Sequence, residues 1–186
     1  MKKRIDINSP VILGLSLISL ILLVLDLLFK FGLNAFLAVR YTSFLDYKMY
    51  IRLFTHVLAH ADLAHFAGNF LLILAVGPLV EEKYSSKKLL STILITALIT
   101  GLINVIFFKN TMLLGASGIA FMLILMASFT NTRRGRLPLT FILIALLYIG
   151  REVYNGLFTS DNISQISHIV GGICGSVCGL LHSQKH

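Results

Sequence analysis

The chain has 186 residues, of which 56% are hydrophobic and only 13% are charged. Soluble globular domains carry about 25% charged residues, so this composition excludes an ordinary soluble domain and indicates a polytopic membrane protein. The formal net charge is +8, but the basic residues fall between the apolar runs, so we expect a lipid bilayer as partner and no nucleic acid.

The apolar runs predict six membrane-spanning helices, at residues 10–29, about 56–80, 89–108, about 117–129, 137–148 and 163–181. A span needs roughly 20 residues, so six spans use most of the chain and leave no room for a second soluble domain. The first run lacks the small-residue cleavage site of a signal peptide and is interpreted as a true span. We therefore expect an all-α membrane protein with one domain over residues 1–186.

The charge distribution predicts the orientation of these spans. Six spans place both termini on one side, and the segments 1–8, 81–88, 131–136 and the C-terminal tail hold most of the lysines and arginines. Short basic segments belong on the cytoplasmic side, so an N-in, C-in topology is favoured. The long connection at about 30–55 is then on the outer face, and loops beyond about 12–15 residues are usually functional.

The first polar motif, "RLFTHVLAHADLAHFAGNF", lies at residues 52–70. His65 and Asn69 are four residues apart and share a helix face, and His56 and His60 form a second such pair slightly above. Paired histidines can ligate zinc, although the zinc-protease pattern HExxH is absent. The other possibilities are hydrogen-bond donation to a developing negative charge, which suits His65 with Asn69, and polar contacts between helices.

The second motif, "GASG", places Ser117 between glycines at the start of the fourth apolar run. Glycines such as Gly115 permit unusual backbone angles and close approach. A helix N-terminus offers unpaired N–H groups that suit an oxyanion. A serine at this position is either a helix cap or a nucleophile activated by a base, most often histidine.

The third motif, "SHIVGGICG", places His168 above a column of glycines at three- and four-residue steps, including Gly171, Gly175 and Gly179. Such a face lets two helix backbones approach closely, so His168 is expected against a neighbouring helix. It is either a histidine satisfied by a buried partner or the base that activates Ser117.

The three motifs on spans two, four and six together resemble the rhomboid family of intramembrane serine proteases. The resemblance covers nearly the whole chain, and Arg52 and Glu81 also fall where bacterial members often carry an arginine and a glutamate. It implies a rhomboid-like bundle in the bacterial cytoplasmic membrane that cleaves transmembrane segments of single-span membrane proteins, without metal or cofactor. The implied catalytic residues are Ser117 and His168, and the implied oxyanion-stabilising residues are Asn69, His65, Ser117 and Gly115.

Two features depart from the family pattern. The chain contains no tryptophan, so the Trp-Arg pair of the first outer loop in many members is missing. Phe121 occupies the position of a tyrosine that packs on the histidine in many bacterial members, and a phenyl ring can still pack there.

Three alternatives remain open from the sequence. One is an inactive rhomboid-like protein that binds transmembrane segments. The second is a transporter that uses intramembrane histidines as a proton relay, although no internal repeats are visible. The third is a metal-dependent enzyme built on His56, His60 and His65.

Overall fold

The computed structural model describes residues 7–130, 136–158 and 162–183. Within these ranges the chain forms eight α-helices and one short 3-10 helix, and the only β pairing is an isolated antiparallel bridge between Val39 and Leu113. The prediction of an all-α protein is therefore confirmed for the described part of the chain.

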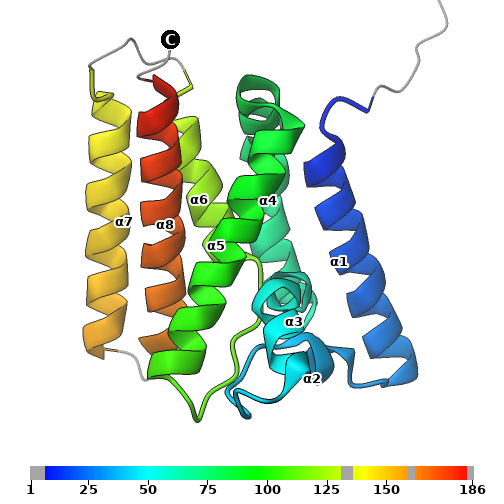
Figure 1. Ribbon diagram of the computed structural model, residues 1–186. Helices are drawn as coiled ribbons and strands as arrows, with labels where there is room; N and C mark the ends of the chain where they lie inside the picture. Colours follow the sequence, from blue (N-terminus) through cyan, green and yellow to red (C-terminus); the bar gives the residue numbers. More distant parts are fainter. Residues whose placement is uncertain (1–6, 131–135, 159–161, 184–186) are drawn as a thin grey trace, which may run out of the picture.

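The longer helices form a bundle in which consecutive members run in opposite directions (Figure 1). The start of α1 and the end of α8 consequently lie at the same end of the bundle. The helices concerned are α1 (Pro10–Phe29), α4 (Leu63–Tyr84), α5 (Ser86–Phe107), α6 (Ser117–Ala127), α7 (Leu139–Phe158) and α8 (Asn162–Ser183).

Among the described residues, α1, α4 and α5 are long and apolar enough to cross a membrane. Helix α6 and the segment Ile166–Leu181 of α8 are apolar but shorter. Large apolar side chains such as Leu71 and Phe107 are 74% and 72% exposed, which suits contact with lipid tails. The described helices therefore have the character of a multi-pass membrane protein.

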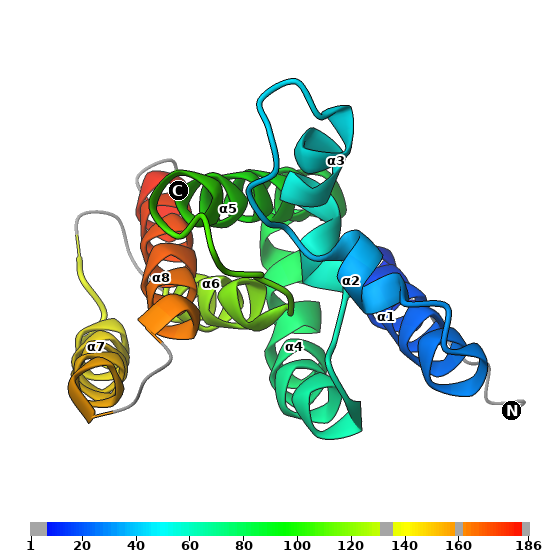
Figure 2. The ribbon, with the colours of Figure 1, turned by 90° about the horizontal axis from the view of Figure 1, so that it is seen from below.

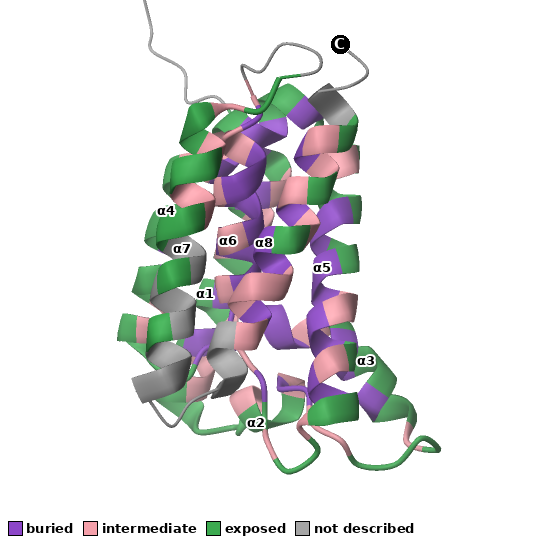
Figure 3. Ribbon diagram, turned by 90° about the vertical axis from the view of Figure 1, so that its left-hand side faces the viewer, coloured by how far each residue is buried: buried purple, intermediate pink, exposed green. Residues whose placement is uncertain are grey.

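Helix α6 lies in the centre of the bundle. Most of its residues are buried, among them Ile119, Met122 and Leu123. Figure 3 shows buried residues on α5, α6 and α8, whereas α4 presents a largely exposed outer face. The lipid is therefore kept away from the helix that begins with Ser117.

The second predicted span begins later than expected. Residues His56–Leu58 form the 3-10 helix η1, and α4 begins only at Leu63. The Asp62 carboxylate caps α4 by accepting a hydrogen bond from the His65 backbone N–H at 2.7 Å. The prediction that His56 and His60 share a face of the second span is therefore wrong, because both precede the helix.

The first long connection, expected as a loop, contains the helices α2 (Leu33–Leu37) and α3 (Tyr47–Thr55). The Asp26 carboxylate caps α2 by accepting from the N–H groups of Leu33 and Asn34, at 2.7 and 3.2 Å. Both short helices lie at the end of the bundle opposite the start of α1 (Figures 1 and 2).

Arg52 on α3 joins these two helices. Its side chain is buried, its Nε donates to the Phe36 carbonyl at 2.8 Å, and the guanidinium lies 5.8 Å from the centre of the Phe36 ring. The arginine noted in the sequence therefore holds the connection together.

Helix α1 is attached to α4 through Glu81, which is 2% exposed. Its two carboxylate oxygens accept hydrogen bonds from the N–H groups of Val11 and Ile12, each at 3.0 Å. One turn away, Gly77 lets the Ile12 side chain approach the α4 backbone, where any Cβ would collide with it. The carboxylate stabilises the N-terminus of α1 because it accepts from unpaired N–H donors and places negative charge at the positive end of the helix dipole.

Candidate active site

The turn that leads into α6 is held by the segment before α4. Gly115 has φ +117°, a left-handed conformation that glycine tolerates without steric cost. Its N–H donates to the His56 carbonyl at 3.0 Å, and the Ala116 N–H donates to the His60 Nε2 at 3.3 Å. These bonds fix the backbone immediately before Ser117.

Ser117 is the first residue of α6. The helical hydrogen bonds begin with the Ala120 N–H, which donates to the Ala116 carbonyl at 2.9 Å. The Ser117 N–H precedes this ladder, and among the described residues nothing accepts it. A backbone donor is therefore available beside the serine hydroxyl.

His65 and Asn69 on α4 converge on the turn from the other side. A Cβ placed on Gly115 would lie 2.7 Å from His65 Nε2 and 3.6 Å from Asn69 Nδ2. Asn69 Nδ2 is buried and has no hydrogen-bond partner within the described ranges. Two side-chain nitrogens thus border the space that the absent side chain of Gly115 leaves open next to Ser117.

The contribution of Gly115 differs from that of a hydrogen-bond donor. Because its N–H is already bonded to the His56 carbonyl, it has no proton to offer an oxyanion. Gly115 instead provides room, since any larger residue would meet the His65 ring.

Helix α8 packs against α6 through the column of glycines. A Cβ on Gly171 would overlap the backbone of Gly118, and a Cβ on Gly175 would overlap the backbone of Met122. One turn further, Gly179 faces the Phe129 ring. Because the contacts advance together along both helices, α6 and α8 run parallel with their backbones in close approach.

This packing sets the position of His168. The rings of His168 and Phe121 lie 4.6 Å apart between centroids and are inclined by 45°. Phe121 is one turn after Ser117, and Ser167, the neighbour of His168, places its carbonyl 3.2 Å from a Cβ built on Gly118. His168 therefore lies at the level of the first turn of α6, with the phenyl ring against its imidazole.

A small cavity of about 10 Å³ adjoins Ser117. It is lined in part by His56, Thr100 and Ser167, so polar groups surround it. A space of this size holds about one water molecule when two or more polar partners are present.

Sequence reasoning assigned no specific contact to His56 or His60. His60 is fully buried, and its Nε2 accepts the Ala116 N–H while its Nδ1 lies 3.3 Å from the Leu58 carbonyl. Nε2 must be unprotonated to accept, so His60 is neutral with its proton on Nδ1. In the sequence, the only indication of a role for these two histidines is that they lie within the polar motif at residues 52–70.

A zinc site at these histidines finds no support in the described part of the chain. His56 Nε2 lies 3.1 Å from the Ala97 carbonyl, and both nitrogens of His60 are bonded to backbone groups. Within the described residues, no three histidine, cysteine, aspartate or glutamate side chains are arranged to hold a metal ion.

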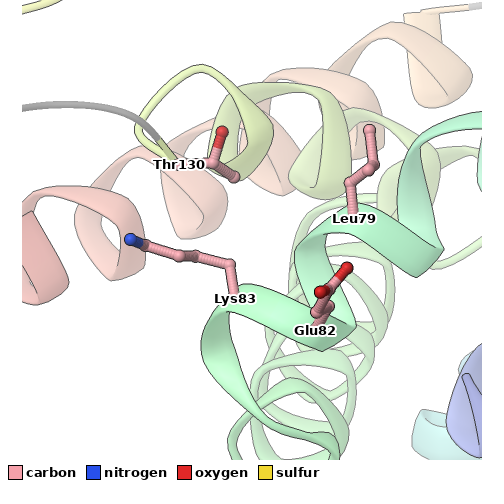
Figure 4. A pocket seen from close by; sticks show the side chains of 4 residues that line it. All are labelled: Leu79, Glu82, Lys83 and Thr130. Atoms are coloured by element: carbon pink, nitrogen blue, oxygen red, sulfur yellow. The ribbon is translucent and has the colours of Figure 1, made fainter. Parts of the chain in front are cut away.

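A larger cavity than the one beside Ser117 lies elsewhere. It measures about 420 Å³ and is lined by Leu79, Glu82, Lys83 and Thr130, whose side chains surround it in Figure 4. It is at the C-terminal ends of α4 and α6, away from Ser117, and the Thr130 hydroxyl donates to the Ala127 carbonyl.

These observations define a multi-pass, all-α membrane protein with a serine at the start of a buried helix and a histidine on the helix beside it. A family model described as the Rhomboid domain matches residues 47–185, from the start of α3 through α8. The chain therefore belongs to the rhomboid family, as the sequence motifs predicted. The match includes every residue of the candidate site. A search of curated proteins returned no match.

Proposed function

We propose that this protein is an intramembrane serine endopeptidase in which Ser117 is the nucleophile and His168 the general base. The observation that carries the proposal is the convergence of Asn69 Nδ2 and His65 Nε2 on the space at Gly115, directly before Ser117. Donors aimed at the position of a developing oxyanion usually supply the largest single contribution to catalysis in acyl-transfer sites.

In the proposed reaction, the Ser117 Oγ attacks a peptide carbonyl and His168 accepts its proton. The tetrahedral oxyanion is stabilised by the Ser117 N–H with the side chains of Asn69 and His65. His168 then gives its proton to the leaving amine, and water hydrolyses the acyl-enzyme by the reverse sequence. No acidic residue lies in the 167–175 motif, so the catalytic unit is a dyad. Phe121 holds the imidazole by ring contact.

The proposed setting is the bacterial cytoplasmic membrane, with six spans and both termini inside. The alternating directions of α1, α4, α5, α6, α7 and α8 support six crossings. The substrates are single-span membrane proteins. A helical substrate backbone is protected by its own hydrogen bonds, so cleavage should favour segments containing Gly, Pro or polar residues.

The test uses purified protein in liposomes with a single-span substrate that carries a glycine-containing site. Wild type, Ser117→Ala and His168→Ala are compared, with Ser91→Ala as a matched control because Ser91 is an exposed serine on α5 that bonds only the Lys87 carbonyl. We expect cleavage by wild type and Ser91→Ala alone, unaffected by a metal chelator. Labelling by a fluorophosphonate should require Ser117.

Two outcomes would overturn the proposal. Cleavage that persists in Ser117→Ala would exclude the serine mechanism. Substrate that co-purifies with wild type, with neither cleavage nor fluorophosphonate labelling, would assign the chain to the inactive relatives that bind transmembrane segments.

A further inference from the structure

An apolar groove runs along α1, and Val57 at its inner wall also lines the small cavity beside Ser117. It encloses about 340 Å³ between α1, α5 and the segment formed by α3 and η1. Ligand pockets in proteins typically measure about 300–1,000 Å³, so the groove is large enough to hold part of a small molecule. Its lining includes Gly14, Ile18, Phe54, Leu58, Leu90 and Leu94.

The lining side chains are not covered by the protein. Ile18, Leu90 and Leu94 are 51%, 46% and 44% exposed. Gly14 lies on the α1 side of the groove, and a Cβ placed on it would meet no atom within 4 Å. The groove is therefore open because α1 carries a glycine where a larger side chain would fit.

A positive charge stands at one end of the groove. Lys87 precedes Leu90 by three residues and Leu94 by seven, so the three lie along one face of α5. Helical side chains incline toward the N-terminus, which directs Lys87 past the groove toward the end of the bundle where α1 and α5 begin (Figure 1). Lys87 is exposed, and within the described residues its ammonium has no hydrogen-bond or ion-pair partner.

We propose that this groove binds one phospholipid with an anionic headgroup. An acyl chain lies along Gly14, Ile18 and Leu94, and the headgroup phosphate meets Lys87 at the membrane surface. The combination of an apolar surface, open toward the bilayer, with an exposed lysine beyond one end matches an amphiphile with these two parts. The assignment depends on the membrane setting and is independent of the proposed protease chemistry.

The experiment measures phospholipid retained by the purified protein, using native mass spectrometry in detergent with added phosphatidylglycerol or phosphatidylcholine. We expect one tightly held phosphatidylglycerol on the wild type. Gly14→Phe should remove it by filling the groove, whereas Leu17→Phe, which adds the same ring on an exposed position of α1, should retain it.

The headgroup contact is tested separately. Lys87→Gln should lower the affinity for phosphatidylglycerol about fivefold, as expected for one basic residue at an anionic surface. The affinity for phosphatidylcholine should fall less, because its choline group already offsets the phosphate charge. Lys83→Gln is the control, because Lys83 is an exposed lysine on α4 that lines a different cavity. Soluble glycerol phosphate should not displace the lipid, because it lacks the acyl chain.

Several results would overturn the proposal: equal retention in Gly14→Phe and wild type, no headgroup preference in wild type, or displacement by glycerol phosphate. If Gly14→Phe does not fold, the Lys87→Gln comparison still decides the outcome, because Lys87 is exposed. A second copy of the chain in place of the lipid would appear as a dimer that Gly14→Phe dissociates, and would also contradict the assignment.

Discussion

The Nε2 atom of His60 lies 3.3 Å from the backbone nitrogen of Ala116, the residue directly before Ser117. The same turn is bonded one residue earlier, from the Gly115 N–H to the His56 carbonyl. The segment between α3 and α4 thus positions the start of α6, although it contributes no atom to the proposed proton transfer.

Replacing His60 with Phe should reduce activity. The ring contacts of His60 with Phe66 and Phe70, both at 5.4 Å between centroids, can persist in the variant, but the Ala116 N–H loses its acceptor. An unsatisfied buried donor costs about 1–3 kcal/mol. We expect slower fluorophosphonate labelling of Ser117, measured against His60→Gln, whose side-chain oxygen can still accept. Equal labelling rates in wild type and His60→Phe would contradict this positioning role.

Replacing Glu81 with Gln should destabilise the fold. The carboxylate accepts two backbone N–H groups of α1, whereas an amide offers only one oxygen and presents its NH₂ to the other N–H. We expect a loss of about 1–3 kcal/mol in the free energy of unfolding. Thermal denaturation in detergent measures this, with the exposed neighbour Glu82→Gln as control. If Glu82→Gln lowered the denaturation temperature as much as Glu81→Gln or more, the loss of surface charge, rather than the loss of the α1 contact, would be responsible.

Adding one methyl group at Gly171 should separate α6 from α8. The Cβ of Gly171→Ala would overlap the Gly118 backbone, which cannot move as a flexible side chain does. Overpacking of this kind typically costs about 1–3 kcal/mol. Gly68→Ala on α4 is the matched control, because a Cβ there meets no atom within 4 Å. We expect a lower denaturation temperature for Gly171→Ala only; equal values would show that the two helices are not in backbone contact.

Acid should loosen the start of α3. Asp46 caps this helix, and the Thr42 hydroxyl, together with the Lys48 N–H, lowers the pKa of its carboxyl below the ordinary value of 3.8. A lowered pKa means that the cap stabilises the helix at any pH above that ordinary value and is lost as the pH falls through the folded-state pKa. Hydrogen-exchange protection of the Lys48 amide should therefore persist at pH 5 and disappear in stronger acid. In Asp46→Asn the protection should no longer depend on pH in this range.

The features that the sequence predicted are those with local patterns. The glycine column below His168 follows from helical spacing, and four of the six apolar runs give their helices to within three residues at each end. Helix α4 begins seven residues after the start of its run, and α7 continues ten residues beyond the end of its run. Helix α2 was missed because its cap is Asp26, seven residues before Leu33 and on a different helix. The contact of His60 with Ala116 joins positions 56 residues apart and follows no repeat, so only the folded chain reveals it.

The glycine contacts between α6 and α8 determine when, during synthesis and membrane insertion, the proposed site can form. Helix α6 is short and buried, and its backbone packs against a helix that is synthesised later, after α7. While α8 is still in the ribosome, Ser117 has neither His168 nor the α8 surface that covers one side of its helix. The nascent chain therefore passes through the insertion machinery without an assembled site, and the proposed protease becomes competent only when its final described helix docks.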